Sequence, residues 1–270
     1  MARLTDIATG PLFHHALLRL ADDHVLWYQR YHHLVVDAYG CVLITRRAGE
    51  LYEGSTETAP KPVQALVDAD QAYRGSPARE ADRAFWHAKM ADHPEPVRLV
   101  PRAAGQVREV IRRTVELPDP LSSRQVFAAV AAYAHRVTGA TDLVLAMPVT
   151  GRRDAVSRVT PGMASTVLPL RVTVRPDTTI TDLIAAVDRE IREVVPHSAY
   201  RGEDLARELG LRDGIPELVG PTVNYLGFGR EMGFADLDAA FHMLSLGPVN
   251  DLTTSFLQRA DGRLVVTFEA

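Results

Sequence analysis

Residues 31–40 read Tyr31-His32-His33-Leu34-Val35-Val36-Asp37-Ala38-Tyr39-Gly40. The apolar-rich run just before this stretch, residues 25–30, has the pattern of a strand, and a helical pattern follows from Val42 to Tyr52. The stretch is therefore predicted to connect a strand to a helix. Since connections between regular elements often carry the chemistry of a fold, its two imidazoles and one carboxylate form a candidate site.

A β-hairpin is predicted on the N-terminal side of this stretch. Two apolar-rich runs, 11–20 and 25–31, are separated by the short polar segment Ala21-Asp22-Asp23-His24. Two such runs joined by a short turn are typical of antiparallel strands. The strand that leads into His32 is therefore expected to have its predecessor as a partner.

Helices and strands are mixed along the rest of the chain without strict alternation. Helices are predicted at 39–53, 62–73, 78–91, 122–138, 179–194 and 202–209, and strands at 107–117, 142–149, 166–174, 222–228, 241–246, 252–258 and 264–268. Pro169 is expected at an edge or bulge, and Ala260-Asp261-Gly262 is expected to close a hairpin. The pattern predicts an α/β sandwich with a mixed sheet, in two lobes.

A segment rich in Pro and Gly, residues 94–106, is the predicted lobe boundary, which gives an N-terminal lobe at 1–100 and a C-terminal lobe at 101–270. A chain of 270 residues accommodates two modest domains. Its net charge of −4 gives no general reason to expect nucleic-acid or membrane binding. The single cysteine, Cys41, excludes an internal disulfide and fits a reducing compartment. With no apolar leader or membrane span in the sequence, a cytoplasmic location is predicted.

The residues alone leave three interpretations of the His32-His33-x3-Asp37 pattern. In the first, the histidines are incidental and Asp37 caps the next helix. The second is a metal site, which is disfavoured because neighbouring side chains on a strand point to opposite faces. The third is general acid/base catalysis, in which a neutral imidazole accepts a proton from an amine or hydroxyl. Asp37 would then need a cationic partner, which the loop Gly151-Arg152-Arg153 could supply.

The segment His32–Ala38 resembles the His-His-x3-Asp-Gly signature of nonribosomal peptide synthetase condensation domains, and its His-x3-Asp part resembles the wider chloramphenicol acetyltransferase-like superfamily. Further segments agree with the condensation family in order. They are Pro11-Leu12-Phe13, Phe85-Trp86-His87, Pro148-Val149-Thr150-Gly151-Arg152, Gly162-Met163 with Val167-Leu168-Pro169-Leu170-Arg171, His197 with Tyr200–Leu205, and Gly220–Asn224.

The resemblance implies a two-lobed, chloramphenicol acetyltransferase-like mixed-sheet sandwich that forms amide bonds. The catalytic role falls on His33, with His32 in support, and Asp37 is expected to hold the loop by pairing with Arg152. Donor and acceptor would arrive as thioesters on the phosphopantetheine of upstream and downstream carrier proteins, through a tunnel between the lobes. Neither a metal nor a directly bound cofactor is implied, and other synthetase domains are expected partners.

The expected contacts to the tunnel or substrate are Ala38, Tyr39, Gly40, Thr166 and Asn224. Two positions depart from the family pattern, since Ala38 replaces a glycine and Thr166 replaces an asparagine. If the glycine position required positive φ, Ala38 would cost about 1 kcal/mol.

The signature lies close to the N-terminus, so the chain is expected to be a fragment with an incomplete first lobe and a slightly shortened C-terminus. Such a lobe would expose strand edges and apolar surface. Two alternatives remain beside condensation: an epimerising or ester-forming relative that uses the same His33, and a catalytically degenerate domain that docks carriers or a partner without chemistry.

Overall fold

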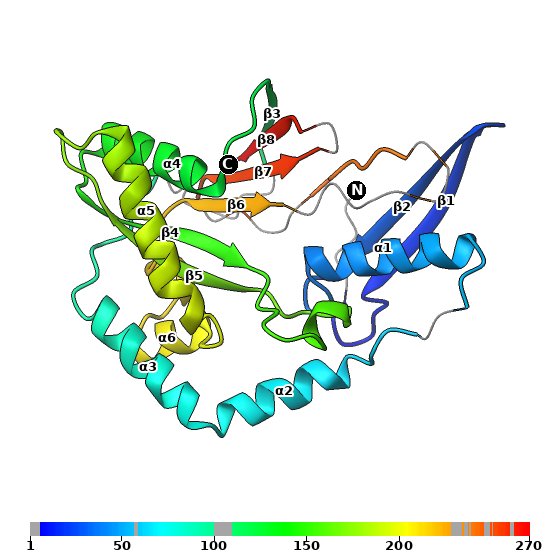
Figure 1. The fold of residues 1–270 in the computed structure, drawn as a ribbon, viewed down its shortest axis with the longest axis horizontal. Helices are drawn as coiled ribbons and strands as arrows, with labels where there is room; N and C mark the ends of the chain where they lie inside the picture. Colours follow the sequence, from blue (N-terminus) through cyan, green and yellow to red (C-terminus); the bar gives the residue numbers. More distant parts are fainter. Residues whose placement is uncertain are drawn as a thin grey trace.

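The computed structural model describes residues 6–56, 59–99, 110–227, 234, 237, 239–245, 249, 251–259 and 262–270. Within them, the strands form a two-stranded sheet and a six-stranded sheet. Two helices, α2 (Gln64–Arg74) and α3 (Pro77–Met90), form an arc that runs from one sheet region to the other (Figure 1). The mixed α/β architecture predicted from the sequence is confirmed.

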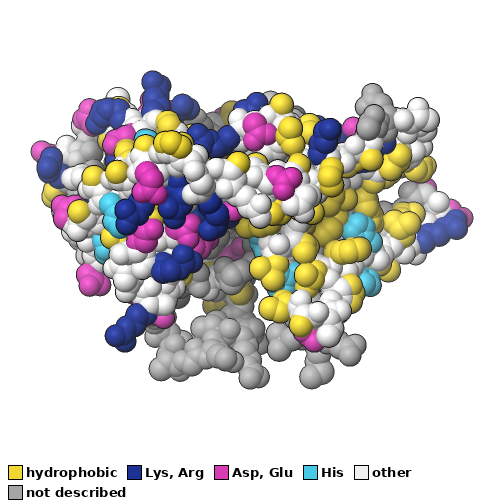
Figure 2. Space-filling view, turned by 90° about the horizontal axis from the view of Figure 1, so that it is seen from below, with side chains coloured by type: hydrophobic (Ala, Val, Ile, Leu, Met, Phe, Trp, Pro, Cys, Tyr) yellow, Lys and Arg dark blue, Asp and Glu magenta, His cyan; other side chains and the backbone are white. Residues whose placement is uncertain are grey.

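The two-stranded sheet is the predicted hairpin. Strands β1 (Phe13–Ala21) and β2 (His24–Tyr31) pair antiparallel, with Phe13 opposite Tyr31. Many of their large apolar side chains are exposed: Phe13, Leu17, Leu18, Leu20, Val25, Leu26 and Tyr28. Figure 2 shows apolar side chains gathered with histidines at this end of the molecule. The apolar exposure expected for this lobe is therefore present.

Helix α1 (Ala38–Tyr52) begins directly after the histidine stretch, because Asp37 provides its N-cap. Helix α3 starts at Ser76 and Pro77, a capping serine followed by a proline whose missing N–H costs nothing at this position. Although α3 precedes the predicted lobe boundary, its Trp86 and Met90 belong to the core of the larger sheet. The segment before the boundary thus packs partly on the C-terminal half.

The larger sheet has the strand order β3-β8-β7-β6-β4-β5. Its strands are β3 (Arg112–Leu117), β4 (Asp142–Val149), β5 (Thr166–Thr173), β6 (Thr222–Leu226), β7 (Thr253–Gln258) and β8 (Leu264–Glu269). The pairs β4–β6 and β6–β7 are parallel and the others antiparallel, so the sheet is mixed. Pro169 lies on β5, which is an edge strand, as a proline in a sheet requires.

Helices α4 (Ser123–Thr138) and α5 (Ile180–Val194) pack together and against this sheet. A capping box of Ser122 and Gln125 starts α4, and Gly139, with φ of 75°, ends it. The short helix α6 (Gly202–Glu208) packs against α3 and β5. Together they bury a continuous apolar core that includes Leu143, Leu145, Leu168 and Leu170, and this core supports the strands and loops around the candidate site. None of the helices in the described ranges is long and apolar enough to cross a membrane.

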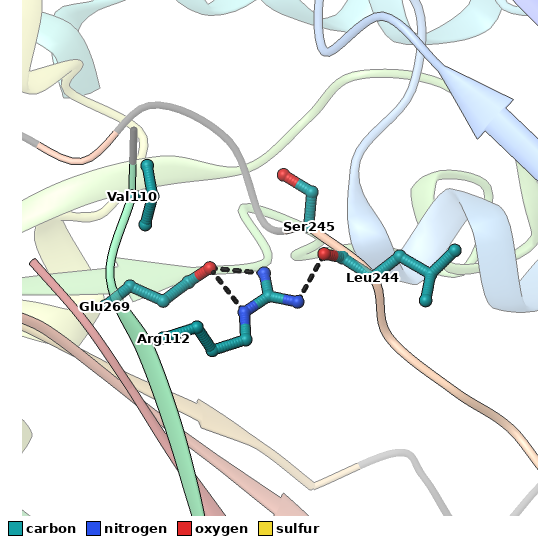
Figure 3. Close-up of a pocket in the computed structure, with 5 residues that line it drawn as sticks. All are labelled: Val110, Arg112, Leu244, Ser245 and Glu269. Carbon is teal, nitrogen blue, oxygen red and sulfur yellow. Dashed lines mark hydrogen bonds and ion pairs between the residues drawn. The ribbon is translucent and has the colours of Figure 1, made fainter. Parts of the chain in front are cut away.

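One strand prediction was wrong. Residues 241–245 form no strand, and Leu246 lies outside the described residues. The carbonyls of Met243 and Leu244 instead accept hydrogen bonds from the guanidinium of Arg112, which also pairs with Glu269 (Figure 3). These carbonyls are satisfied by a side chain rather than by a neighbouring strand. Arg112, Leu244 and Glu269, with Val110 and Ser245, line a pocket of about 290 Å³ that includes none of the predicted site residues. Residues 107–109, 228, 260 and 261 of the other predicted strands and turn also lie outside the described ranges.

Candidate active site

His32 is held by the backbone on both of its sides. Its N–H donates to the carbonyl of Leu12 at 2.7 Å, which joins the histidine stretch to the segment before β1. Its ring Nδ1 accepts the N–H of Leu34 at 3.1 Å. In the neutral ring the proton must then reside on Nε2. The side chain of His32 is therefore used in shaping the turn that presents the next residue.

His33 lies in the turn between β2 and α1, and its side chain is exposed. No hydrogen bond or ion pair joins its imidazole to any other residue in the described part of the chain. Its two ring nitrogens are therefore available to a molecule that approaches this turn. Neutral imidazole at this position can accept a proton from such a molecule.

Asp37 is the polar centre of the connection and is only 2% exposed. Its Oδ1 accepts the N–H of Gly40 at 2.7 Å and so caps α1. Its Oδ2 accepts the guanidinium of Arg152 at 2.5 Å and the N–H groups of Ala164 and Ser165, both at 2.9 Å. Four donors thus fix this carboxylate, and they come from the start of α1 and from the loop between β4 and β5.

Arg152 completes the buried pair, with its side chain 1% exposed. Its Nη2 donates to the carbonyl of Gly162 at 2.9 Å and its Nη1 to that of Thr150 at 3.2 Å, while its guanidinium lies 4.9 Å from the centre of the Tyr39 ring. Because both charges are buried, removing one partner costs far more than the pair itself contributes. The pairing of Asp37 with Arg152 that the resemblance implies is present in the structure.

Gly151 explains why a glycine precedes this arginine. Its φ of 63° is left-handed, and a Cβ here would lie 2.1 Å from the carbonyl oxygen of Ala164. Only glycine permits both the turn and the close approach. The loop that brings the Ala164 amide to Asp37 therefore depends on this residue.

The other predicted contact residues fall into different places. Ala38 is the first residue of α1 and is helical, so the positive φ that would have penalised alanine is not required. Gly40 is buried and Tyr39 half-buried against Arg152. Thr166 starts β5 next to the Ser165 amide that binds Asp37, and its buried hydroxyl has no hydrogen-bond partner among the described residues.

Asn224 lies half-buried on β6. In the described part of the chain it makes no hydrogen bond or ion pair with the other candidate residues. The structure thus bonds Asp37 to Arg152 directly beneath the turn that carries His32 and His33, and no hydrogen bond or ion pair in the described chain joins Asn224 to them.

Cys41, one helical turn after Asp37, is the nearest thiol to the site. Burial, reinforced by the negative charge of Asp37, raises the pKa of this thiol to about 11. It therefore stays protonated near neutral pH and is a poor nucleophile. Among the described residues there is also no group of three or more His, Cys, Asp or Glu side chains suited to a metal ion.

The sequence did not reveal the backbone partners of the site. The amides of Ala164 and Ser165 and the carbonyl of Gly162 contribute as much to fixing Asp37 and Arg152 as side chains do. Backbone groups exist at every position, so nothing in the residue types marks them. The sequence signal for this loop is its pair of glycines, Gly151 and Gly162.

Known proteins of one family match this chain. The model of the condensation-domain family matches residues 1–243. The isonitrile lipopeptide synthase of Streptomyces coeruleorubidus and the dimodular nonribosomal peptide synthase of Bacillus subtilis are each 36% identical over 97% of this chain, which spans 19% and 12% of their lengths.

Solved structures agree with the sequence matches. The first condensation domain of the CDA synthetase has a TM-score of 0.84 and 35% identity, covering 96% of this chain and 62% of that one. A mutant starter condensation domain of the rhizomide synthetase RzmA, in complex with C8-CoA and Leu-SNAC, has a TM-score of 0.86 and 34% identity, covering 98% and 65%. The chain therefore spans less than two thirds of each of these relatives. By sequence and by fold, it belongs to the condensation-domain family of nonribosomal peptide synthetases.

Proposed function

We propose that this chain carries the site for amide-bond formation between a carrier-bound acyl or aminoacyl thioester and a carrier-bound aminoacyl acceptor. His33 orients the acceptor amine and accepts its proton. His32 shapes the turn, and Asp37 with Arg152 holds it in place. Ala38, Tyr39 and Thr166 lie close to this unit and are proposed to contact substrate, as is Asn224 from β6.

In the proposed step, the neutral amine attacks the thioester carbonyl. A C–N bond forms, the C–S bond breaks, and the proton released by the amine passes through His33 to the departing thiolate. An α-amino group has a pKa of roughly 7.7–8.0, so only a small fraction is neutral at pH 7. Correct orientation by His33 therefore contributes alongside its basicity.

The observation that carries this proposal is the set of four donors on the buried Asp37. They fix the residue on the C-terminal side of the turn, the hydrogen bond from His32 to Leu12 holds the other side, and the His33 imidazole stays exposed and free of hydrogen bonds within the described chain. A general base needs a fixed backbone and an unoccupied nitrogen. This arrangement supplies both.

The partners follow from the same proposal. The relatives reported above are synthases several times longer than this chain, and the substrates would be delivered by upstream and downstream carrier proteins through their phosphopantetheine arms. The setting is proposed to be the cytoplasm, among other synthetase domains.

A transfer assay tests the proposal. A donor carrier loaded with an acyl group and an acceptor carrier loaded with an amino acid are mixed with the protein, and the acceptor carrier is examined by intact-mass spectrometry. We expect the mass of the acyl group to appear on the acceptor with the wild type and not with His33→Ala. The control is His24→Ala, which removes an exposed histidine from the hairpin. Equal transfer by His33→Ala would refute the role of this residue.

The exposure of His33 also favours a second candidate function, docking of carriers without chemistry, because the imidazole is not shielded from water in this chain. This function predicts no acyl transfer by the wild type in the same assay, together with binding of loaded carriers in a separate calorimetric titration. Transfer by the wild type would exclude it.

A further inference from the structure

Gly162 lies where the site meets another part of the fold. Its carbonyl accepts hydrogen bonds from the N–H of Asp37 at 3.3 Å and from Nη2 of Arg152 at 2.9 Å. It therefore bonds to the backbone of one member of the buried pair and to the side chain of the other. Any displacement of this carbonyl acts on both.

The opposite side of Gly162 faces the start of α2. A Cβ at this position would lie 2.8 Å from Cδ1 of Leu66 and 3.1 Å from Cγ2 of Val63. The first of these distances is shorter than carbon atoms tolerate, so α2 rests on a backbone that has no side chain. Figure 1 shows α2 beginning next to the loop that precedes β5. Leu66 and Val63 are thus in contact with the residue that bonds to Asp37 and Arg152.

The far end of α2 is attached to the C-terminal half. Asp70 pairs with Arg201 at 3.1 Å, and the hydroxyl of Tyr73 donates to Asp82 at 2.9 Å. Asp82 in turn pairs with Nδ1 of His197 at 2.7 Å. Because its C-terminal end is fixed in this way, α2 resists displacement by a group added next to its first turn.

We propose that Leu66 and Val63, acting through Gly162, are positioning residues for His33. Contact with α2 determines the position of the Gly162 backbone and its carbonyl. Through its two hydrogen bonds this carbonyl positions Asp37 and Arg152. These two residues in turn hold the turn that carries the imidazole. The proposal rests on the function proposed above for His33. It adds a contact made by residues at least 30 positions from His33 along the chain, and this contact determines the geometry of the turn.

A rescue experiment tests this coupling. Gly162→Ala introduces a Cβ 2.8 Å from Cδ1 of Leu66 at a φ of 159°, so either the Leu66 side chain or the loop must shift. Leu66→Ala in the same protein removes this closest contact. Gly75→Ala is the matched control, because Gly75 ends the same helix at φ of −90° with no atom closer than 3.9 Å to the added Cβ. Two readouts are used: kcat and KM of acyl transfer, and the imidazole resonances of His33 in a histidine-labelled sample, assigned by their loss in His33→Ala.

We expect Gly162→Ala to lower kcat about 10- to 100-fold with KM nearly unchanged, since a misplacement of about 1 Å has effects of this size. The His33 resonances should shift with it. The double variant should recover part of the lost kcat and return the resonances toward wild type, because the contact with Leu66 is gone while the φ of 159° stays unfavourable for alanine. Gly75→Ala should match wild type throughout. A double variant no better than Gly162→Ala, or unchanged resonances in Gly162→Ala, would overturn the proposal.

The resonances keep this test separate from the proposed function. If the wild type shows no transfer, the shift of His33 and its recovery in the double variant still decide the coupling. If Gly162→Ala does not fold, Leu66→Ala alone must shift the His33 resonances, and an unchanged spectrum in that variant would refute the coupling.

Discussion

Removal of the Asp37 carboxylate should damage folding rather than chemistry alone. Asp37→Ala leaves the guanidinium of Arg152 buried without a counter-charge and removes the acceptor of three backbone N–H groups. Breaking a buried ion pair costs about 3–5 kcal/mol, and loss of an N-cap costs about 1 kcal/mol. Because the two losses share one carboxylate, they overlap, and we expect a total of about 4 kcal/mol.

Urea unfolding followed by circular dichroism measures this loss. At about 2–4 °C per kcal/mol for a chain of this size, the midpoint of thermal unfolding should also fall by roughly 10 °C. Asp23→Ala, which removes an exposed aspartate from the hairpin turn, is the control and should change the free energy of unfolding by less than about 0.5 kcal/mol. His33→Ala should behave like this control.

The reasoning would be refuted if Asp37→Ala unfolded within about 1 kcal/mol of the wild type. It would also be refuted if His33→Ala lost as much stability as Asp37→Ala, since the division between a supporting and a reacting residue would then have no basis.

Three further predictions concern other sites. Burial raises the pKa of Glu208, but hydrogen bonds from His87, Tyr200 and Arg83 outweigh it and hold this pKa at about 2, below its usual 4.5. The wild type should therefore be more stable than Glu208→Gln above pH 4.5, and this difference in the free energy of unfolding should be lost as the pH falls toward 2. Unfolding titrations of both proteins measure it. Thr166→Val replaces a buried hydroxyl that has no partner among the described residues, so we expect unchanged or slightly higher stability together with slower acyl transfer, and a large loss of stability would show that the hydroxyl is bonded in the folded protein. Ser122→Ala removes a capping box and should cost about 1 kcal/mol in urea unfolding, whereas no change would mean that the cap does not stabilise α4.

Local sequence signals predicted most of the regular structure because they act over a few residues. The capping residues Ser122 and Thr179 and the terminating Gly139 mark helix ends that the structure has at the same places. The apolar run at 142–149, predicted as a strand, forms β4 and is largely buried. In each case a turn or a face of the element is determined by residues adjacent in sequence.

Long-range pairing decided what the sequence could not predict. Residues 241–245 have an apolar content suited to a strand, yet the guanidinium of Arg112, about 130 residues away, satisfies two of their carbonyls instead. The contact of α2 with Gly162 likewise depends on two segments nearly a hundred residues apart. Such contacts leave no periodic pattern in the sequence.

The candidate site divides in the same way. The side-chain pair Asp37 and Arg152 could be predicted through resemblance to a family, because its members lie in recognisable motifs. The hydrogen bonds from the amides of Ala164 and Ser165 could not be predicted, because backbone N–H groups occur at every position whatever the residue type. The role of His33 in chemistry remains a prediction, because geometry alone shows only that its ring is accessible.

The most direct test of this role is the single-turnover rate constant for amide formation by the wild type and by His33→Ala. Both are measured at equal concentrations of folded protein, in excess over the loaded carriers, and the background rate of thioester hydrolysis is subtracted. General base catalysis contributes about 10²- to 10⁴-fold, so the account predicts a fall of at least about 100-fold in the variant with an unchanged free energy of unfolding. A rate constant within about threefold of the wild type would contradict it.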